Sequence, residues 1–333
     1  MKSPAVSILL PVRNAVRTLP DAVASLRAQT FTDWELLLVN DGSTDGGDTC
    51  MDALANEDPR IQVMHQPPLG LVTALNRAAE IAKAPFIARM DADDLCHPRR
   101  LERQLEALRA DPDLGLVACR VSFGGDRERN RGYAEHVDWL NRLLTPRDHL
   151  LNRFVESPVA HPSVMWRREV WDTCGGYRDG LFPEDYELWL RWMHAGVAFR
   201  KVPETLLTWN DPPDRLSRTD PRYAVQAFYE VKCDYLAKIL PTNRPLVLWG
   251  AGRVTRRRFA PLCERLGPFA AYVDIAPGKI GQQIEGIPVL SSANLPPNAL
   301  ILVGVAARGA RARIESHLRA TGRLPGKDYW LCA

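Results

Sequence analysis

The sequence lacks long hydrophobic runs, and this limits where the protein can reside. Its longest apolar stretches, such as residues 300–307, fall far short of the roughly 20 residues that a membrane-spanning helix needs. The first residues also show no signal-peptide pattern. We therefore expect a cytoplasmic protein that is at most peripheral at the inner membrane surface.

The sequence also lacks a cysteine framework. It contains seven cysteines, an odd number, and no two have the CxxC spacing of zinc and redox sites. This pattern argues against a disulfide scaffold or a zinc centre and indicates reduced thiols.

No strong excess of either charge is present overall, because the net charge is only +3. Residues 243–333 contain 13 Lys and Arg against 5 Asp and Glu, whereas residues 1–242 contain 30 against 35. The composition changes at residues 240–245, so we predict two domains, 1–242 and 243–333. The basic part lacks interleaved aromatic residues, which argues against nucleic acid as a partner. Contact with anionic lipid and formation of a homodimer remain open.

The first 240 residues alternate between strand-like and helix-like patterns. Apolar strands are expected at residues 5–10, ended by Pro11, and at residues 34–39, 61–64 and 86–90, with an amphipathic helix at residues 18–28. This alternation predicts an α/β domain with a parallel sheet, and such sheets bind ligands at the carboxyl ends of their strands.

Acidic residues follow two of the expected strands. Asp91, Asp93 and Asp94 follow residues 86–90, and Asp41 ends residues 34–41. Clustered carboxylates raise one another's pKa unless a cation compensates, which favours a site for Mg²⁺ or Mn²⁺. The alternative is a solvated turn that caps a helix starting near Pro98. Because two acidic strand ends could meet at one sheet edge, we favour the metal site.

Four segments in this order, residues 6–14, 25–30, 34–45 and 90–94, resemble family 2 glycosyltransferases of the GT-A fold. The resemblance covers most of residues 4–240. It implies a GT-A nucleotide-diphospho-sugar transferase domain, a divalent cation and inversion at the anomeric carbon. The implied donor is a nucleotide-sugar, most often a UDP-sugar, and the implied acceptor is a hydroxyl of a glycan or lipid-linked molecule in surface polysaccharide biosynthesis. The alternative is a catalytically inactive nucleotide-sugar-binding or regulatory protein.

The resemblance also implies roles for residues of the acidic edge. Asp41 would accept a hydrogen bond from the base imide. Asp91 would lie near the ribose or the metal, Asp93 would bind the metal, and Asp94 would bind it or support the other two. The loop beneath the base and ribose would comprise Pro11, Val12, Arg13 and Asn14.

Glu184 and Asp185 open an expected helix in the second half of this region. Acids in a first helical turn are often structural, because they face the positive end of the helix dipole. The resemblance implies instead that Asp185 is the general base and that Glu184 positions it, with Glu184 as the base the alternative. Residues 207–218 have the composition of a mobile loop, from which Arg215 and Ser217 could contact the diphosphate; a plain surface loop is the alternative.

The last 90 residues show a different pattern. An apolar strand runs into the turn Gly250-Ala251-Gly252-Arg253, and a second strand ends at Asp274. This resembles a small Rossmann-like α/β domain, although Thr255 stands where a third glycine is expected. Gly250, Gly252, Arg253 and Asp274 are therefore a possible C-terminal ligand site, for a nucleotide or a nucleotide-sugar. A structural or dimerising domain and NAD chemistry are the alternatives.

Overall fold

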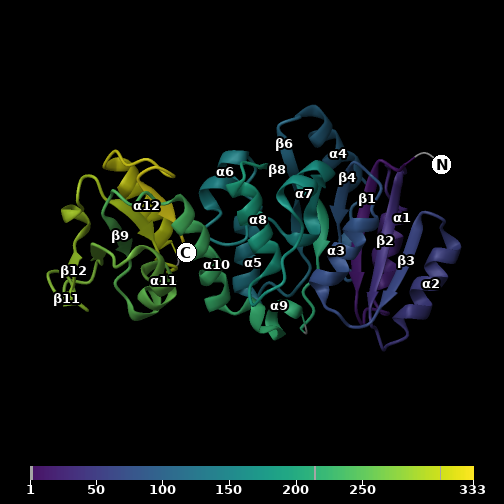
Figure 1. The fold of residues 1–333 in the computed structure, drawn as a ribbon, viewed down its shortest axis with the longest axis horizontal. Coiled ribbons are helices and arrows are strands. Elements are labelled where there is room, and N and C mark those ends of the chain that lie inside the picture. Colours follow the sequence, from purple (N-terminus) through teal and green to yellow (C-terminus); the bar gives the residue numbers. More distant parts are fainter. Residues whose placement is uncertain (1–2, 214, 308) are drawn as a thin grey trace. The chain divides into compact units, whose positions relative to one another are not determined.

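The computed structural model describes residues 3–213, 215–307 and 309–333, which form two compact units (Figure 1). The first unit comprises residues up to His149 together with Val159–Asp220, and the second comprises Leu150–Pro158 and Pro221–Ala333. The second unit therefore includes helix α10 (Val225–Ile239), which precedes the expected boundary at residue 242. That residues 243–333 form a separate folding domain stays a prediction.

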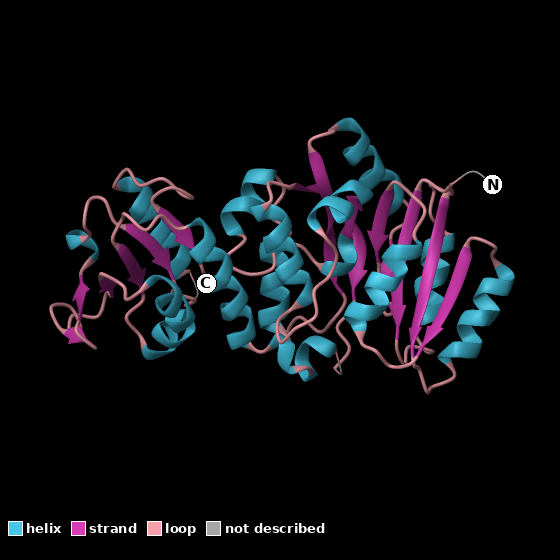
Figure 2. Cartoon of the chain, in the orientation of Figure 1, coloured by secondary structure: helices cyan, strands magenta, loops and turns pink. Residues whose placement is uncertain are grey.

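The first unit is built on a mixed sheet with the strand order β3-β2-β1-β4-β7-β6-β8-β5 (Figure 2). Strands β3, β2, β1 and β4 run parallel to one another, and β7 is antiparallel to both β4 and β6. The carboxyl ends of β1, β2 and β4 therefore share one edge. The strands are β1 (Val6–Val12), β2 (Trp34–Asp41), β3 (Ile61–Gln66), β4 (Phe86–Arg89), β5 (Leu95–Cys96), β6 (Leu114–Phe123), β7 (Val164–Arg167) and β8 (Ala198–Trp209).

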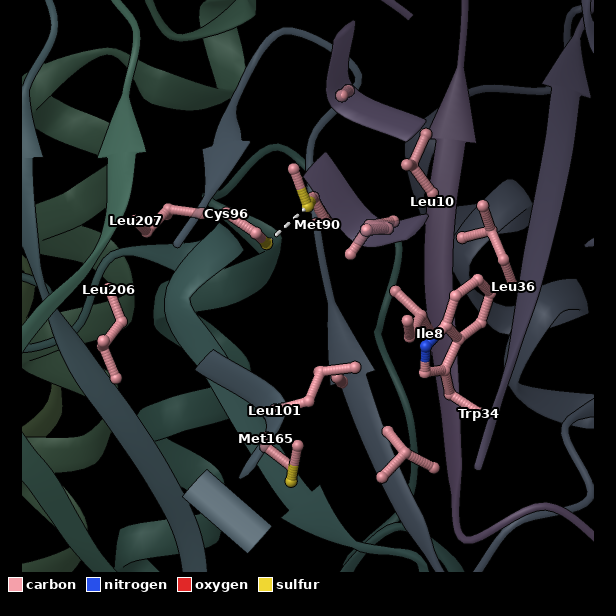
Figure 3. Packing of buried hydrophobic residues seen from close by; sticks show 14 of the residues in the cluster. Ile8, Leu10, Trp34, Leu36, Met90, Cys96, Leu101, Met165, Leu206 and Leu207 are labelled. Carbon is pink, nitrogen blue, oxygen red and sulfur yellow. Dashed lines mark hydrogen bonds between the residues drawn. The ribbon is translucent and has the colours of Figure 1, made fainter. Parts of the chain in front are cut away.

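Helices cover both faces of this sheet, because its strands alternate apolar side chains between two cores. Ile8 and Leu10 of β1 pack into one core with α1 and α4, as Figure 3 shows for part of this cluster, whereas Leu9 packs into the other with α3 and α8. The helical segments of this unit are α1 (Leu19–Arg27), α2 (Gly47–Glu57), α3 (Leu71–Ile81), α4 (Arg100–Ala110), α5 (Arg131–Leu140), η1 (His161–Ser163), α7 (Arg168–Cys174), α8 (Glu184–His194) and α9 (Leu216–Thr219). Helix α6 (Pro146–Asn152) begins in the first unit and ends in the second.

Two local expectations were wrong. Strand β1 does not end at Pro11, because its last pair with β4 joins Leu9 to Arg89 and leaves no ladder with β4 for the proline to break. The expected loop at residues 207–218 begins later, because Leu207 and Thr208 pair with β5 as part of β8. Residue 214 of that stretch lies outside the described residues.

A buried arginine fixes the strand that precedes the acidic residues. Arg100, at the start of α4, donates from Nη2 to the carbonyl oxygen of Arg89 (2.7 Å) and from Nε to Gln104 Oε1 (3.0 Å). Gln104 donates in turn to the carbonyl oxygens of Val117 and Ser163. These buried bonds connect α4, β4 and β6, so the end of β4 is rigidly placed.

The second unit contains a sheet with the order β11-β12-β10-β9-β13-β14, in which only the pair β11 and β12 is antiparallel. Among the described residues, none of the helices has the length and apolar character needed to cross a membrane. Besides α10, the unit contains β9 (Leu246–Trp249), α11 (Arg253–Leu266), β10 (Ala271–Val273), β11 (Gln283–Ile284), β12 (Ile287–Leu290), β13 (Leu300–Val303), α12 (Ala310–Ala320) and β14 (Tyr329–Leu331).

Candidate functional site

Three carboxylates meet where the chain leaves β4. One oxygen each from Asp91, Asp93 and Asp94 lies within 4.8 Å of the others. Asp91 and Asp93 are partly exposed, whereas Asp94 is buried. The three acids expected from the sequence therefore form a single cluster at the carboxyl edge of the parallel strands.

This cluster has more negative charge than its surroundings neutralise. Burial and the charge of Asp91 raise the pKa of Asp93 to about 6. Burial and the same charge also raise the pKa of Asp94 well above its usual range. Asp94 Oδ1 accepts a bond from the backbone N–H of Asn210 (2.8 Å), but within the described part of the chain Oδ2 has no hydrogen-bond partner. Closely spaced carboxylate oxygens with one buried atom unsatisfied fit a hard divalent cation.

Arg89 supplies part of the compensating charge. Its side chain is buried and contacts the carboxylate of Asp91. Burial alone would lower the pKa of Arg89, but the attraction and hydrogen bond to Asp91 outweigh it and raise the pKa. Sequence reasoning missed this residue, although a basic residue inside an apolar strand just before three acids is itself a signal.

Asp41, expected to contact the nucleobase, is bound within the protein. Its Oδ1 accepts bonds from Gln66 Nε2 (2.8 Å) and from the backbone N–H groups of Leu69 (2.8 Å) and Gly70 (3.0 Å). Gly70 precedes α3, so the carboxylate lies at the positive end of that helix. Asp41 therefore fixes the loop from β3 to α3 beside the acidic edge, and Arg13 lies 3.7 Å from its Oδ2.

The loop after β1 is joined to the loop after β2. Asn14 adopts a positive φ of 51°, which asparagine tolerates better than most residues. Its backbone N–H donates to Ser43 Oγ (3.0 Å), and its Oδ1 accepts from the Thr44 N–H (2.8 Å). Pro11 and Val12 are still part of β1 and are buried. Of the four residues expected to form the loop beneath the base and ribose, only Arg13 and Asn14 therefore lie in the loop itself.

Glu184 and Asp185 form the first residues of α8, as expected from the sequence. Glu184 is buried, and Asp185 accepts a bond from the backbone N–H of Tyr186 at Oδ1 (2.7 Å). Burial raises the pKa of Tyr177 well above its usual range; Arg89 opposes the shift, and the charges of Glu184, Asp185 and Asp91 add to it. Charges at the start of α8 and in the acidic cluster therefore both affect the pKa of Tyr177.

Arg215 is held beside the acidic cluster, where its positive charge opposes the rise in the pKa of Asp93. Its guanidinium lies 4.8 Å from the ring centre of Trp209 and 5.0 Å from that of Tyr133, and it pairs with Asp211 (3.2 Å). Ser217 Oγ lies 3.0 Å from the hydroxyl of Tyr133. Both expected diphosphate contacts are thus bound to neighbouring side chains.

The possible C-terminal ligand site lies in the second unit. Gly250 has a φ of 129°, and a Cβ there would lie 3.0 Å from the Thr255 side chain, so the turn requires glycine. Gly252 caps α11, which starts at Arg253. Asp274 pairs with Lys279 (2.7 Å). A ligand at this turn stays a prediction.

Comparison with known proteins identifies relatives of this chain. Residues 7–175 match the model of glycosyl transferase family 2. The chain is 31% identical over 206 residues to the amylovoran biosynthesis glycosyltransferase AmsE of Erwinia amylovora, covering 60% of this chain and 74% of AmsE. The family match ends before Glu184 and Asp185, so it does not test their roles.

Solved structures share the fold. Residues 1–349 of TarS from S. aureus in complex with UDP-GlcNAc superpose with a TM-score of 0.56 at 14% identity, covering 79% of this chain and 71% of TarS 1–349. The mannosyltransferase PcManGT from Pyrobaculum calidifontis, in complex with GDP-Man and Mn²⁺, gives 0.52 at 18% identity and covers 80% and 70%. The family match and the identity with AmsE show that the chain belongs to glycosyltransferase family 2.

Proposed function

We propose that this glycosyltransferase is metal-dependent and inverting, and that it moves a sugar from a nucleotide-sugar to a hydroxyl of a glycan or lipid-linked acceptor. The observation that carries the proposal is the group of carboxylate oxygens of Asp91, Asp93 and Asp94 within 4.8 Å of one another at a parallel-sheet edge. TarS was solved with UDP-GlcNAc and PcManGT with GDP-Man, which supports a nucleotide-sugar donor, and of these we favour a UDP-sugar. The kinship with AmsE supports a role in surface polysaccharide biosynthesis.

Asp93 and Asp91, with Asp94 as a ligand or a support, would hold Mg²⁺ or Mn²⁺. The cation would neutralise the charge that the departing nucleoside diphosphate gathers. The complex of PcManGT with Mn²⁺ and GDP-Man supports this assignment. Arg215 lies close enough to affect Asp93 and would add a second positive charge beside the diphosphate.

Asp185 would act as the general base on the acceptor hydroxyl. A base must lie within hydrogen-bond reach of the proton that it removes, and the first turn of α8 is fixed from both sides of Asp185. The Tyr186 N–H orients its Oδ1, and Glu184 is buried directly before it. The oxygen of the acceptor would then attack the anomeric carbon as its proton passes to Asp185, and the bond from that carbon to the nucleoside diphosphate would break.

The test of the proposal is a thermal-shift screen of nucleotide-sugars with and without Mn²⁺, followed by transfer assays with the ligands that bind. A ligand at 100 times its Kd stabilises the native state by about 2.7 kcal/mol. We expect a shift that requires Mn²⁺ and turnover that EDTA abolishes. Binding without turnover for any donor would support the inactive, regulatory alternative instead.

For the C-terminal turn we propose a separate measurement, because no ligand class is assigned to it. Calorimetry on the full chain with UDP, NAD and coenzyme A would be compared with a Gly250→Val variant, whose side chain would fill the turn. Binding heat that is present with wild type and absent with the variant would support a ligand site at Gly250, Gly252, Arg253 and Asp274. Equal results for both proteins would favour a structural or dimerising role.

A further inference from the structure

A buried polar cluster lies at the start of α8. It contains His161 of η1, Tyr177 after α7 and Glu184 of α8, with exposed fractions of 8%, 5% and 2%. The charge of Arg89 of β4, which is 2% exposed, acts on the histidine and the tyrosine. Burying ionisable groups is costly unless they satisfy one another. These ionisable groups come from four separate segments, so packing alone does not explain why they are buried close together.

Tyr177 and His161 form the centre of the cluster. The hydroxyl of Tyr177 lies 2.6 Å from His161 Nε2, and His161 Nδ1 lies 3.9 Å from Glu184 Oε1. The imidazole also packs edge-on against Trp189, one turn along the same helix, with ring centres 5.9 Å apart. His161 therefore contacts α8 at two places, Glu184 in its first turn and Trp189 in its second.

The backbone of Tyr177 is fixed independently by α3. Asn76 donates from Nδ2 to the carbonyl oxygen of Tyr177 (3.0 Å) and accepts at Oδ1 from its backbone N–H (3.1 Å). This two-point contact leaves the tyrosine little freedom. The hydroxyl is therefore held in place for His161.

Burial and nearby charges determine the protonation of His161 and Tyr177. Burial and the charge of Arg89 lower the pKa of His161 well below its usual range, so the ring is neutral. The pKa of Tyr177 is raised by burial, so its hydroxyl keeps its proton. When that hydroxyl donates to Nε2, the remaining ring proton is on Nδ1 and faces the carboxylate of Glu184.

We propose that Tyr177 and His161 are positioning residues that hold Glu184, and through it the adjacent Asp185, in the orientation needed for transfer. This inference rests on the proposed role of Asp185 as general base. A displacement of about 1 Å in a reacting group can lower a rate by about 100-fold. The connection from α3 through Tyr177 and His161 to α8 prevents such a displacement.

The primary test is Tyr177→Phe, which removes one hydroxyl and keeps the ring that packs against Trp171. We expect kcat for transfer to fall about 30-fold with the donor KM close to wild type, and the melting temperature to fall by a few degrees, because the buried His161 Nε2 loses this hydroxyl. Tyr229→Phe is the matched control, since it removes another buried tyrosine hydroxyl, in the second unit, and should leave kcat unchanged.

Combining Tyr177→Phe with Asp185→Asn distinguishes positioning from general stabilisation. If the tyrosine acts through Asp185, Tyr177→Phe causes no further loss of kcat once the base is absent. Losses that multiply in the double variant, or a kcat loss that Tyr229→Phe reproduces, would overturn the inference. A wild-type protein that transfers no sugar would instead refute the proposed function.

A second pair of variants covers the case in which Tyr177→Phe does not fold. His161→Ala should lower kcat about 100-fold, and His161→Asn should recover at least about 10-fold of it. The reason is that the amide nitrogen of asparagine occupies the place of Nδ1, which faces Glu184. Equal kcat values for the two variants would contradict the positioning role.

Discussion

The two ends of the parallel strands in the first sheet both contain buried carboxylates, but their surroundings differ. We call the end where these strands begin the amino edge and the end where they finish the carboxyl edge. At the amino edge, Glu35 accepts bonds from Ser7 Oγ (2.6 Å), the Lys83 N–H (2.8 Å) and Gln62 Nε2 (2.9 Å). At the carboxyl edge, Asp93 and Asp94 have raised pKa values, and Asp94 Oδ2 has no hydrogen-bond partner among the described residues.

This difference separates a structural carboxylate from a functional one. A satisfied carboxylate such as Glu35 stabilises the strands that it joins. Crowded carboxylates such as Asp93 and Asp94 cost folding energy, and a ligand that neutralises them recovers it. Carboxylate side chains therefore have opposite effects at the two ends of the parallel strands.

The largest expected effect is on catalysis. Asp93→Asn should lower transfer about 1000-fold, because it removes a carboxylate from the proposed metal site. The melting temperature without metal should stay the same or rise, since one repelling charge is removed. Initial rates with Mn²⁺ and thermal melts with EDTA measure both quantities. A variant that remains active but is strongly destabilised would show that Asp93 has a structural role instead of a catalytic one.

At the opposite edge the largest effect should be on stability. Glu35→Ala leaves Ser7 and the Lys83 N–H without their shared acceptor, and we expect a loss of about 3 kcal/mol in the free energy of unfolding. Urea denaturation measures this loss. The kcat of the folded fraction should equal that of wild type, so a specific fall in kcat would show that the edges are not separable.

The pH dependence of stability should come from the acidic edge. The pKa of Asp93 is raised from 3.8 to about 6, so between these values the native state binds more protons than the unfolded state. The free energy of unfolding without metal should therefore fall, by about 2 kcal/mol, as pH rises through this window. Denaturation of wild type and Asp93→Asn from pH 4 to 7 in EDTA tests this, and parallel curves would contradict it.

The smallest expected effect is on stability and concerns Gln62, at the amino edge. Gln62 is only partly buried and donates one bond to Glu35, so Gln62→Ala should cost about 1 kcal/mol. Combined with Glu35→Ala it should cost almost nothing more, because the shared bond is already lost. A double-mutant cycle by urea denaturation measures the coupling, and strict additivity would exclude it.

The local pattern of the first unit could be predicted from the sequence. Alternating apolar residues predict the strands, and the acids that follow β2 and β4 predict a polar edge, because parallel strands end on the same side. The course of β1 through Pro11 was not predictable, since it depends on where the neighbouring strand β4 ends.

Part of the site was also beyond sequence reasoning. The sequence places Asp41 at a strand end but gives no sign that Gln66, Leu69 and Gly70 would bind it. Arg215 similarly meets Tyr133 across 82 residues of chain. Such contacts depend on how loops pack, and loop packing has no periodic signal.

The sequence by itself determined the family, the α/β class and the clustering of three acids after one strand, because each of these depends on residues close together in the chain. Only the tertiary structure decided which carboxylates are satisfied and which are not. It made Asp41 an anchor for a loop, left Asp94 Oδ2 unsatisfied within the described residues, and joined Tyr177, His161 and Glu184 in one buried cluster. The reason is that desolvation and hydrogen bonding depend on every group that surrounds an atom, and those groups come from distant segments.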